Sequence, residues 1–295
     1  MKHFIDISDY NIKELNSIIL TAKKIKKNPE KYKSRCKSKT LGMIFQKESI
    51  RTRVSFAVGF QKLGGHSIEL NADSIGFGKR ESVQDILNTL SQFIDFLVIR
   101  NNNHETIRKL SLQNSLPIIN GLSDYSHPCQ ILSDLLTINE KIGNIKNKTI
   151  SWMGDYNNVL RSLIHLQNLY LFKLNIIMPK QILENSKSKI IKKNSKNLFV
   201  TSNINEGIKN SNCVMTDTWV SMGEKNKFKK KYFRNYQVNK DVMKLASKEA
   251  IFMHCLPAHR DEEVSSELLD SDKSVVWQQA QNRMFVQQAI ILNLL

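Results

Sequence analysis

Residues 46–58 bring together the side-chain types that bind a phosphate group. Ser49, Arg51 and Thr52 follow the apolar residues 41–46, and a helical pattern opens directly after them at Val54. Hydroxyls, guanidinium groups and free backbone N–H groups at a helix start form an anion site, and arginine can hold phosphate through two parallel hydrogen bonds. The pattern indicates phosphate binding, with a capped helix and two solvated arginines as the structural alternative. It is not a Walker A loop, because the glycine-rich turn is missing.

A histidine and an amide lie at the start of a second expected helix, which runs to Leu136. Pro128 suits the first turn of that helix, and His127 and Gln130, three residues apart, project to one face. An imidazole and an amide can both donate a hydrogen bond to a carbonyl oxygen. A structural histidine before a proline is the alternative.

An acid and a thiol follow apolar runs in the second half of the chain. Residues 213–218 deliver Asp217, whose carboxylate could hold an ammonium group or, with Ser221, cap a turn. Residues 251–255 end in His254 and Cys255. A thiol beside a histidine is a candidate nucleophile, but there is no separate Cys–His–Asn pattern, and a buried structural cysteine is equally consistent.

The last polar motif is Asn282–Arg283–Met284. The apolar positions that follow, among them Phe285 and Ile290, predict a final helix that begins at this motif. Taken alone, Arg283 is consistent with a surface arginine on a terminal docking helix.

Short β-rich runs alternate with amphipathic helical patterns and position these motifs. The expected strands are residues 41–46, 67–70, 96–100, 118–120, 149–154, 175–179, 198–201, 213–218, 251–255 and 274–277. This alternation predicts an α/β fold of two tandem doubly wound domains with mostly parallel sheets. Ligands of such folds sit beyond the carboxyl ends of strands and between domains, and the polar motifs lie just after strands.

The polar residues 140–148 are the expected domain boundary. We expect residues 1–140 to form one domain together with the C-terminal helix, residues 279–295, and residues 149–278 to form the other. A chain of 295 residues with 41% apolar residues is long enough for two domains with real cores.

Composition excludes several classes of protein. The net charge of +17 could attract nucleic acid, but the basic residues are scattered without interleaved aromatics, so a solvated surface that draws in an anionic substrate is expected. The sequence has no run of eighteen apolar residues, so we expect no membrane span. Its first residues do not resemble a secretory signal. The four cysteines form no CxxC pair, so we expect no metal site, no disulfides and a cytoplasmic location.

In this order, the motifs resemble those of the ornithine carbamoyltransferases along nearly the whole chain. SIRTR is similar to the family's carbamoyl-phosphate loop STRTR, and HPCQ to its HPxQ motif. GDYNNV and DTWVSMGE resemble segments of its ornithine domain, HCLP matches the motif of its active-site cysteine, and QNRM stands for ENRM. SMG together with HCLP distinguishes this family from the aspartate carbamoyltransferases.

The resemblance implies transfer of a carbamoyl group from carbamoyl phosphate to the side-chain amine of L-ornithine, in arginine metabolism, without metal or organic cofactor. It implies carbamoyl-phosphate binding by Ser49, Ile50, Arg51, Thr52, Arg100, His127, Gln130 and Arg283. It implies ornithine binding by Asn158, Asp217, Ser221, Met222, Cys255 and Leu256. The implied catalytic residues are Arg100, His127 and Cys255, with Cys255 positioning ornithine and forming no covalent intermediate. The family assembles as homotrimers or multiples of trimers, with active sites at subunit interfaces and between domains.

Two positions depart from the family. Ile50 stands where the loop usually has threonine, and Gly76 stands where similar enzymes lend a glutamine to the neighbouring subunit's site. We hypothesise that Lys79 or Arg80 replaces that glutamine. Two other functions stay open: carbamoylation of an acylated ornithine or another amine, against which Asp217 argues, and non-catalytic RNA binding.

Overall fold

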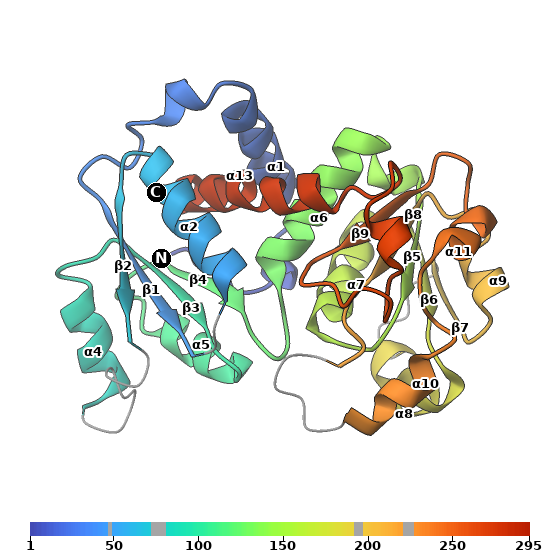
Figure 1. The fold of residues 1–295 in the computed structure, drawn as a ribbon. Coiled ribbons are helices and arrows are strands. Elements are labelled where there is room, and N and C mark those ends of the chain that lie inside the picture. Colours follow the sequence, from blue (N-terminus) through green and yellow to red (C-terminus); the bar gives the residue numbers. More distant parts are fainter. Residues whose placement is uncertain (47–48, 72–80, 192–196, 221–226) are drawn as a thin grey trace. The chain divides into compact units, whose positions relative to one another are not determined.

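The chain forms two compact units, and each has its own parallel sheet. The computed structural model describes residues 1–46, 49–71, 81–191, 197–220 and 227–295. The first unit comprises Met1–Ser133 and Asn282–Leu295, and the second comprises Asp134–Gln281. Helices pack on both sheets, as the ribbon in Figure 1 shows. The predicted α/β class with doubly wound, parallel sheets is therefore confirmed.

The sheet of the first unit has four parallel strands in the order β2-β1-β3-β4. Their bounds are β1 Thr40–Phe45, β2 His66–Leu70, β3 Phe96–Arg100 and β4 Ile118–Leu122. β1 and β3 are almost wholly buried, as strands of a parallel sheet covered on both faces should be, whereas the edge strand β2 is mostly exposed. Helices α4 and α5 contribute Leu87 and Ile107 to the core around Leu97 and Ile99.

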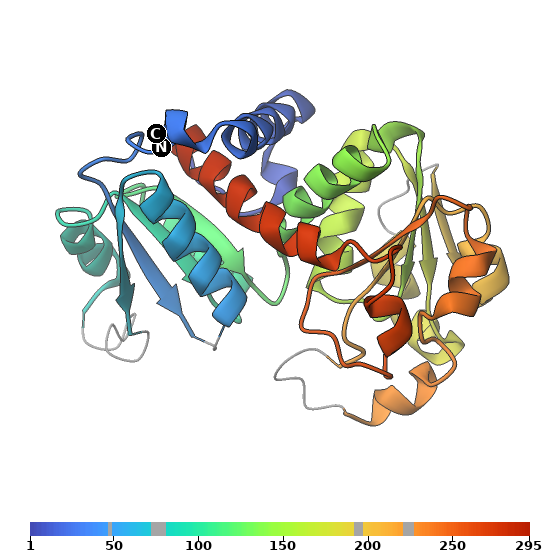
Figure 2. The same ribbon diagram turned by 45° about the horizontal axis from the view of Figure 1, so that its top comes forward.

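Helices of the first unit include residues from both ends of the chain. They are η1 Ile7–Asp9, α1 Ile12–Lys27, η2 Pro29–Tyr32, α2 Ile50–Lys62, α4 Val83–Leu90 and α5 His104–Leu112, with parts of α6 Pro128–Lys141 and α13 Val276–Leu294. Figure 2 shows α13 beside α1 and α2. Lys26 Nζ donates to Asn282 Oδ1 at 2.8 Å, and Gln288 Nε2 donates to the Gly59 carbonyl at 2.9 Å. α13 thus docks on α1 and α2 through one part-buried and one buried hydrogen bond.

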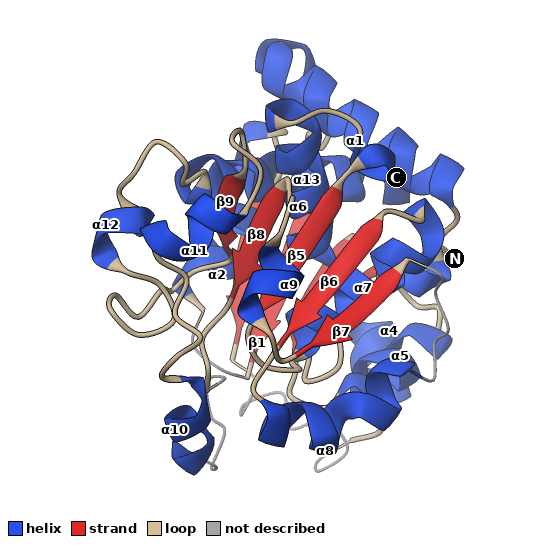
Figure 3. Cartoon of the chain, turned by 90° about the vertical axis from the view of Figure 1, so that its right-hand side faces the viewer, coloured by secondary structure: helices blue, strands red, loops and turns tan. Residues whose placement is uncertain are grey.

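The sheet of the second unit has five parallel strands in the order β7-β6-β5-β8-β9. Their bounds are β5 Thr149–Met153, β6 Lys173–Ile177, β7 Leu198–Thr201, β8 Cys213–Thr216 and β9 Ile251–His254. Figure 3 shows this sheet, in which β6 and β7 lie on one side of β5, and β8 and β9 lie on the other. The strand order reverses between β5 and β8, and ligand sites of such sheets lie beyond the carboxyl ends at that point.

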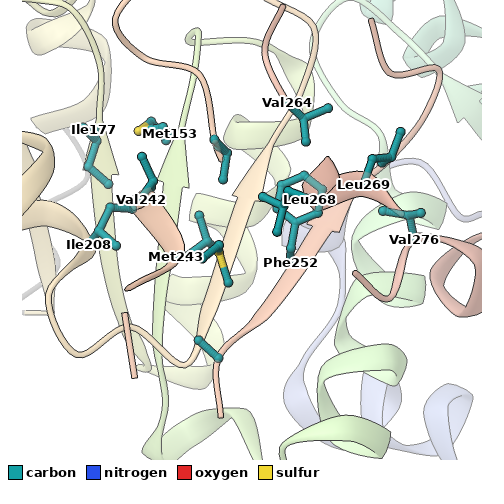
Figure 4. Close-up of a cluster of buried hydrophobic side chains, with 13 residues drawn as sticks. Met153, Ile177, Ile208, Val242, Met243, Phe252, Val264, Leu268, Leu269 and Val276 are labelled. Atoms are coloured by element: carbon teal, nitrogen blue, oxygen red, sulfur yellow. The ribbon is translucent and has the colours of Figure 1, made fainter. Parts of the chain in front are cut away.

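Helices and a buried cluster complete the second unit. The helices are η3 Ile145–Asn147, α7 Asn158–Tyr170, α8 Lys180–Ile191, α9 Ile204–Ile208, η4 Lys227–Lys229, α10 Lys230–Phe233, α11 Lys240–Leu245 and α12 Ser266–Leu269. Figure 4 shows the cluster, in which Phe252 of β9 is surrounded by Leu268, Leu269 and Val276. Burial of a large apolar side chain stabilises the fold by about 1.5–3 kcal/mol. The packing of Val276 in this cluster therefore holds the start of α13 beside β9.

The expected strand at residues 274–277 is wrong. Ser274 makes only an isolated bridge with Phe252, and helix α13 already begins at Val276. Asn282 therefore lies in the second turn of that helix and not at its start. The run around Val275 is apolar because it packs in the core, and a short apolar run cannot distinguish a strand from the start of a buried helix. No helix in the described part of the chain is long and apolar enough to cross a membrane.

Candidate active site

Polar side chains of the first unit meet where β1 and β3 end and where helices begin. Arg100 is the last residue of β3, and its Nη1 donates to Ser49 Oγ at 2.7 Å. Ser49 occupies the N-cap position of α2 but makes no side-chain capping bond, because its hydroxyl faces Arg100. From α13, Arg283 Nη2 donates to Thr52 Oγ1 in the first turn of α2 at 2.8 Å. The structure thus brings together four of the residues predicted to hold carbamoyl phosphate.

Three guanidinium groups share this region. Burial is the main reason why the pKa of Arg100 falls to about 10, and the charges of Arg283 and Arg51 lower that pKa further. The Nε atom of Arg100 is buried and has no hydrogen-bond partner among the described residues. Positive charges held close together in a partly buried site repel one another, and an anion with two charges would relieve this repulsion. The arrangement is therefore an anion site in which a donor remains to be satisfied.

His127 lies among the same arginines and is almost fully buried at the start of α6. Burial lowers the pKa of His127 well below its ordinary value, and the charges of Arg283, Arg100 and Arg51 lower it further. The imidazole is consequently neutral at neutral pH and has one N–H to donate. Gln130, also buried, follows in the first turn of the same helix. Two neutral donors beside the arginines suit the polarisation of a carbonyl oxygen.

Ile50 differs from its neighbours because its side chain is 76% exposed. It opens α2, so only its backbone can contribute at the anion site. The predicted positions Gly76, Lys79 and Arg80 lie outside the described residues.

In the second unit, Asp217 follows β8 and receives three hydrogen bonds. Asn157 Nδ2 donates to its Oδ2 at 2.6 Å, while the Thr218 N–H and Cys255 Sγ donate to its Oδ1 at 2.8 and 3.1 Å. Asn157 is itself fixed, because its Oδ1 caps helix α7 at the N–H groups of Val159 and Leu160. The carboxylate is therefore held in one orientation before any ligand arrives. The Cys255 thiol is one of the three donors that hold it.

The turn after β9 is held by His254. His254 Nδ1 accepts from the Leu256 N–H at 2.8 Å, and Nε2 donates to Glu263 Oε1 at 3.1 Å. Burial raises the pKa of Glu263, but the bonds from His254 and the His259 N–H lower it more, so the pKa lies below its ordinary value. Leu256 has φ of +59°, which costs a residue with a side chain about 1–3 kcal/mol and requires such support.

Three side chains with metal-binding atoms lie close together at the ends of β8 and β9. Ligand atoms of Asp217, His254 and Cys255 lie within 4.8 Å of one another. However, the Nδ1 lone pair of His254 accepts from Leu256, and Nε2 carries the hydrogen given to Glu263. The histidine then has no lone pair to offer a metal ion, so this group is arranged to fix a turn.

Several residues that position the site were not predicted from the sequence. Asn157 orients Asp217, whereas the residue predicted to bind ornithine is its neighbour Asn158, the first residue of α7. Asp155, in the same segment, forms a buried ion pair with Lys229. The available signal for Asn157 was an asparagine directly before a helical pattern, since asparagine is a preferred N-cap residue. The predicted ornithine-binding residues Ser221 and Met222 lie outside the described residues.

Two models of known protein domains match successive parts of the chain. The model of the carbamoyl-phosphate-binding domain of the aspartate/ornithine carbamoyltransferases matches residues 2–140, and the model of the aspartate/ornithine-binding domain matches residues 146–294. The two matches together define the protein as a two-domain carbamoyltransferase. The chain belongs to the aspartate/ornithine carbamoyltransferase family.

Individual relatives share one description. An ornithine carbamoyltransferase of Rhodopseudomonas palustris is 43% identical over 98% of this chain and 95% of its own length. An ornithine carbamoyltransferase of Brucella suis is 41% identical over 99% of this chain and 95% of its own length. The crystal structure of ornithine carbamoyltransferase from Burkholderia thailandensis superposes with a TM-score of 0.90 at 33% identity, covering 100% of this chain and 99% of that one.

Proposed function

We propose that this protein is an ornithine carbamoyltransferase, which converts carbamoyl phosphate and L-ornithine to L-citrulline and phosphate. The observation that carries the proposal is the cluster of Arg51, Arg100 and Arg283 around a neutral His127. These charges suit the phosphate of carbamoyl phosphate, and the neutral imidazole suits its carbonyl oxygen. The relatives described as ornithine carbamoyltransferases support the choice of amine.

The first unit would bind carbamoyl phosphate and activate it. Arg51, Arg100 and Arg283 would neutralise the phosphate, while the hydroxyls of Ser49 and Thr52 and backbone N–H groups at the start of α2 would orient it. His127 and Gln130 would donate to the carbonyl oxygen, on which negative charge grows as the amine attacks. One such donor is worth roughly 10²–10³ in rate.

The second unit would bind ornithine. Asp217 would pair with the α-ammonium group, and Asn158, Ser221, Met222 and Leu256 are the other proposed ornithine-binding residues. Cys255 would lie against the side-chain amine, which must be neutral to attack. An alkyl amine titrates near ~10.4 in water, and removal of water from the site favours the neutral form. The amine nitrogen then forms a bond to the carbonyl carbon, the carbon–oxygen bond to phosphate breaks, and the amine loses a proton.

The assembly and setting are also proposals. Ile50, Val54 and Val58 form an apolar row on α2 with exposed fractions of 76%, 51% and 36%, and Ile68 on the edge strand β2 is 41% exposed. We assign this row to a homotrimer or a multiple of trimers, which Val54→Asp should dissociate in light-scattering measurements. A cytoplasmic role in arginine biosynthesis fits the four free cysteines and the relative from Campylobacter jejuni, which is described as anabolic. The functional domains would be residues 1–140 with 279–295, and residues 149–278.

The test is product analysis with several amines. Purified protein should form citrulline and an equal amount of phosphate from carbamoyl phosphate and ornithine. Aspartate, lysine and an acylated ornithine should give little or no carbamoylated product. The acylated ornithine should react poorly because it has no α-ammonium group to pair with Asp217. Faster carbamoylation of the acylated ornithine would overturn the assigned substrate, and absence of carbamoyl transfer to every amine would overturn the enzyme class.

A further inference from the structure

A buried amide connects the first turn of α13 to the backbone at the end of β9. Gln279 Oε1 accepts from the His254 N–H at 3.0 Å, and Gln279 Nε2 donates to Asp134 Oδ1 at 2.8 Å. All three residues are almost completely inaccessible to solvent. A primary amide can accept at one end and donate at the other while remaining neutral, which these two contacts require.

The path of the chain explains why Gln279 lies there. Residues 273–275 run along the outer edge of β9, because Phe252 N–H donates to the Lys273 carbonyl at 2.7 Å and Val275 N–H donates to the Phe252 carbonyl at 3.0 Å. α13 begins immediately afterwards, and its first turn brings Gln279 to the last residue of β9. Cys255 directly follows His254 in the chain, and Leu256, with its left-handed backbone, comes next.

His254 is therefore fixed from two directions. Its imidazole bonds to Leu256 and Glu263, and its backbone N–H bonds to Gln279. Asp134 secures the far end of the Gln279 amide, so that the amide cannot rotate without losing a buried hydrogen bond.

Asp134 also lies on a helix that serves the other substrate. It is on α6, one turn after Gln130 and two turns after His127, which begins that helix region at the anion site. The helix is continuous from Pro128 to Lys141. A residue at the carbamoyl-phosphate half and the support of the turn at Cys255 thus belong to one element of secondary structure.

We propose that Gln279 and Asp134 are positioning residues for the amine substrate. They hold the backbone of His254 so that Cys255 and Leu256 keep the geometry in which ornithine binds. The inference rests on the proposed function. Neither side chain need touch a substrate, and their removal should therefore affect ornithine use and spare carbamoyl-phosphate binding.

The main test is Gln279→Met, which keeps the volume and removes both hydrogen bonds. The KM for ornithine should rise about threefold to tenfold, as expected for the loss of one or two buried bonds. The Kd for carbamoyl phosphate, measured without ornithine, should change less than twofold. Gln278→Met is the matched control, because Gln278 lies in the same helical turn and donates to Glu140, also on α6, at 2.6 Å without contacting the turn. It should leave both constants unchanged.

Asp134 provides a graded pair of variants. Asp134→Asn keeps an oxygen that can accept from Gln279, and its effect on the KM for ornithine should be smaller than that of Asp134→Leu, which removes the acceptor. If Gln279→Met matches Gln278→Met, or if it weakens both substrates equally, the positioning role is wrong. The same holds if the two Asp134 variants are indistinguishable.

A second readout does not depend on activity. Cys255 is half-buried while Cys36, Cys129 and Cys213 are buried, so alkylation followed by mass spectrometry reports on Cys255. Its alkylation rate should change in Gln279→Met and stay the same in Gln278→Met; an unchanged rate in both contradicts the inference. If the wild-type protein makes no citrulline, the proposed function fails, and the alkylation comparison still decides whether Gln279 fixes the turn.

Discussion

The two units place polar groups at the carboxyl ends of parallel strands but arrange opposite charges there. In the first unit, burial and the charges of neighbouring arginines lower the pKa of both His127 and Arg100. The second unit supplies Asp217 with three donors of its own. The anion site is thus under repulsion until a ligand arrives, whereas the carboxylate site is satisfied in advance. The difference indicates that carbamoyl phosphate stabilises its half strongly, while ornithine enters a half that is already organised.

The largest effect should follow from changing the charge geometry of the anion site. Arg51→Lys keeps the charge but loses the planar pair of donors, so carbamoyl-phosphate affinity should fall about tenfold or more, since a bond to a charged group is worth about 1.5–3 kcal/mol. Arg53→Lys is the matched control. Arg53 lies in the same turn but pairs with Glu69 and stacks on Phe45, so affinity should stay within twofold. Calorimetric titration of both variants measures the contrast, and an unaffected Arg51→Lys would refute the assignment of Arg51.

The first half-site was also the easier one to predict. Ser49, Arg51, Thr52 and His127 lie within a few residues of a strand end or a helix start, where local rules for anion binding apply. The strands themselves were predictable because buried parallel strands are continuous apolar runs. The same rule wrongly predicted a strand at residues 274–277. There the apolar residues belong to a loop that makes one isolated bridge with β9 and to the buried start of α13.

The supports of the second half-site could not be predicted, because they join distant parts of the chain. Asn157 and Asp217 are separated by 60 residues, and Asp134 and Gln279 by 145. The sequence around each of these four residues does not indicate which distant residue it contacts. The strand ends indicated where Asp217 and Cys255 lie, and tertiary packing decides what holds them. The roles given to the individual site residues remain predictions.

A moderate effect is expected at Cys255. Its thiol donates a hydrogen bond to Asp217, and we predict that it positions ornithine and forms no covalent intermediate. Cys255→Ala should lower kcat/KM for ornithine about threefold to tenfold, as expected for one neutral hydrogen bond, without abolishing turnover. Incubation of the wild-type enzyme with carbamoyl phosphate alone should yield no carbamoylated Cys255 by mass spectrometry. Detection of that adduct would show that the thiol forms a covalent intermediate.

The smallest effect concerns stability in acid. The folded pKa of His127 lies well below its ordinary value, so between the two values the unfolded chain binds more protons and stability falls as pH falls below about 6.5. His127→Asn should make this decline shallower by at most one proton, about 1.4 kcal/mol per pH unit. Urea unfolding between pH 7 and pH 5 measures the slope. An unchanged slope would mean that burial and the neighbouring arginines do not hold the pKa of His127 below its ordinary value.

The division of labour between the units is tested most directly by one reciprocal pair of variants. Asp217→Asn removes the charge held by Asn157, Thr218 and Cys255, and Arg100→Met removes the cation bonded to Ser49. Both constants, the KM for ornithine and the Kd for carbamoyl phosphate, are measured in each variant. We predict that Asp217→Asn weakens ornithine by about tenfold or more and leaves carbamoyl phosphate within twofold, and that Arg100→Met does the reverse. Equal losses of both substrates in either variant would contradict the assignment of one substrate to each unit.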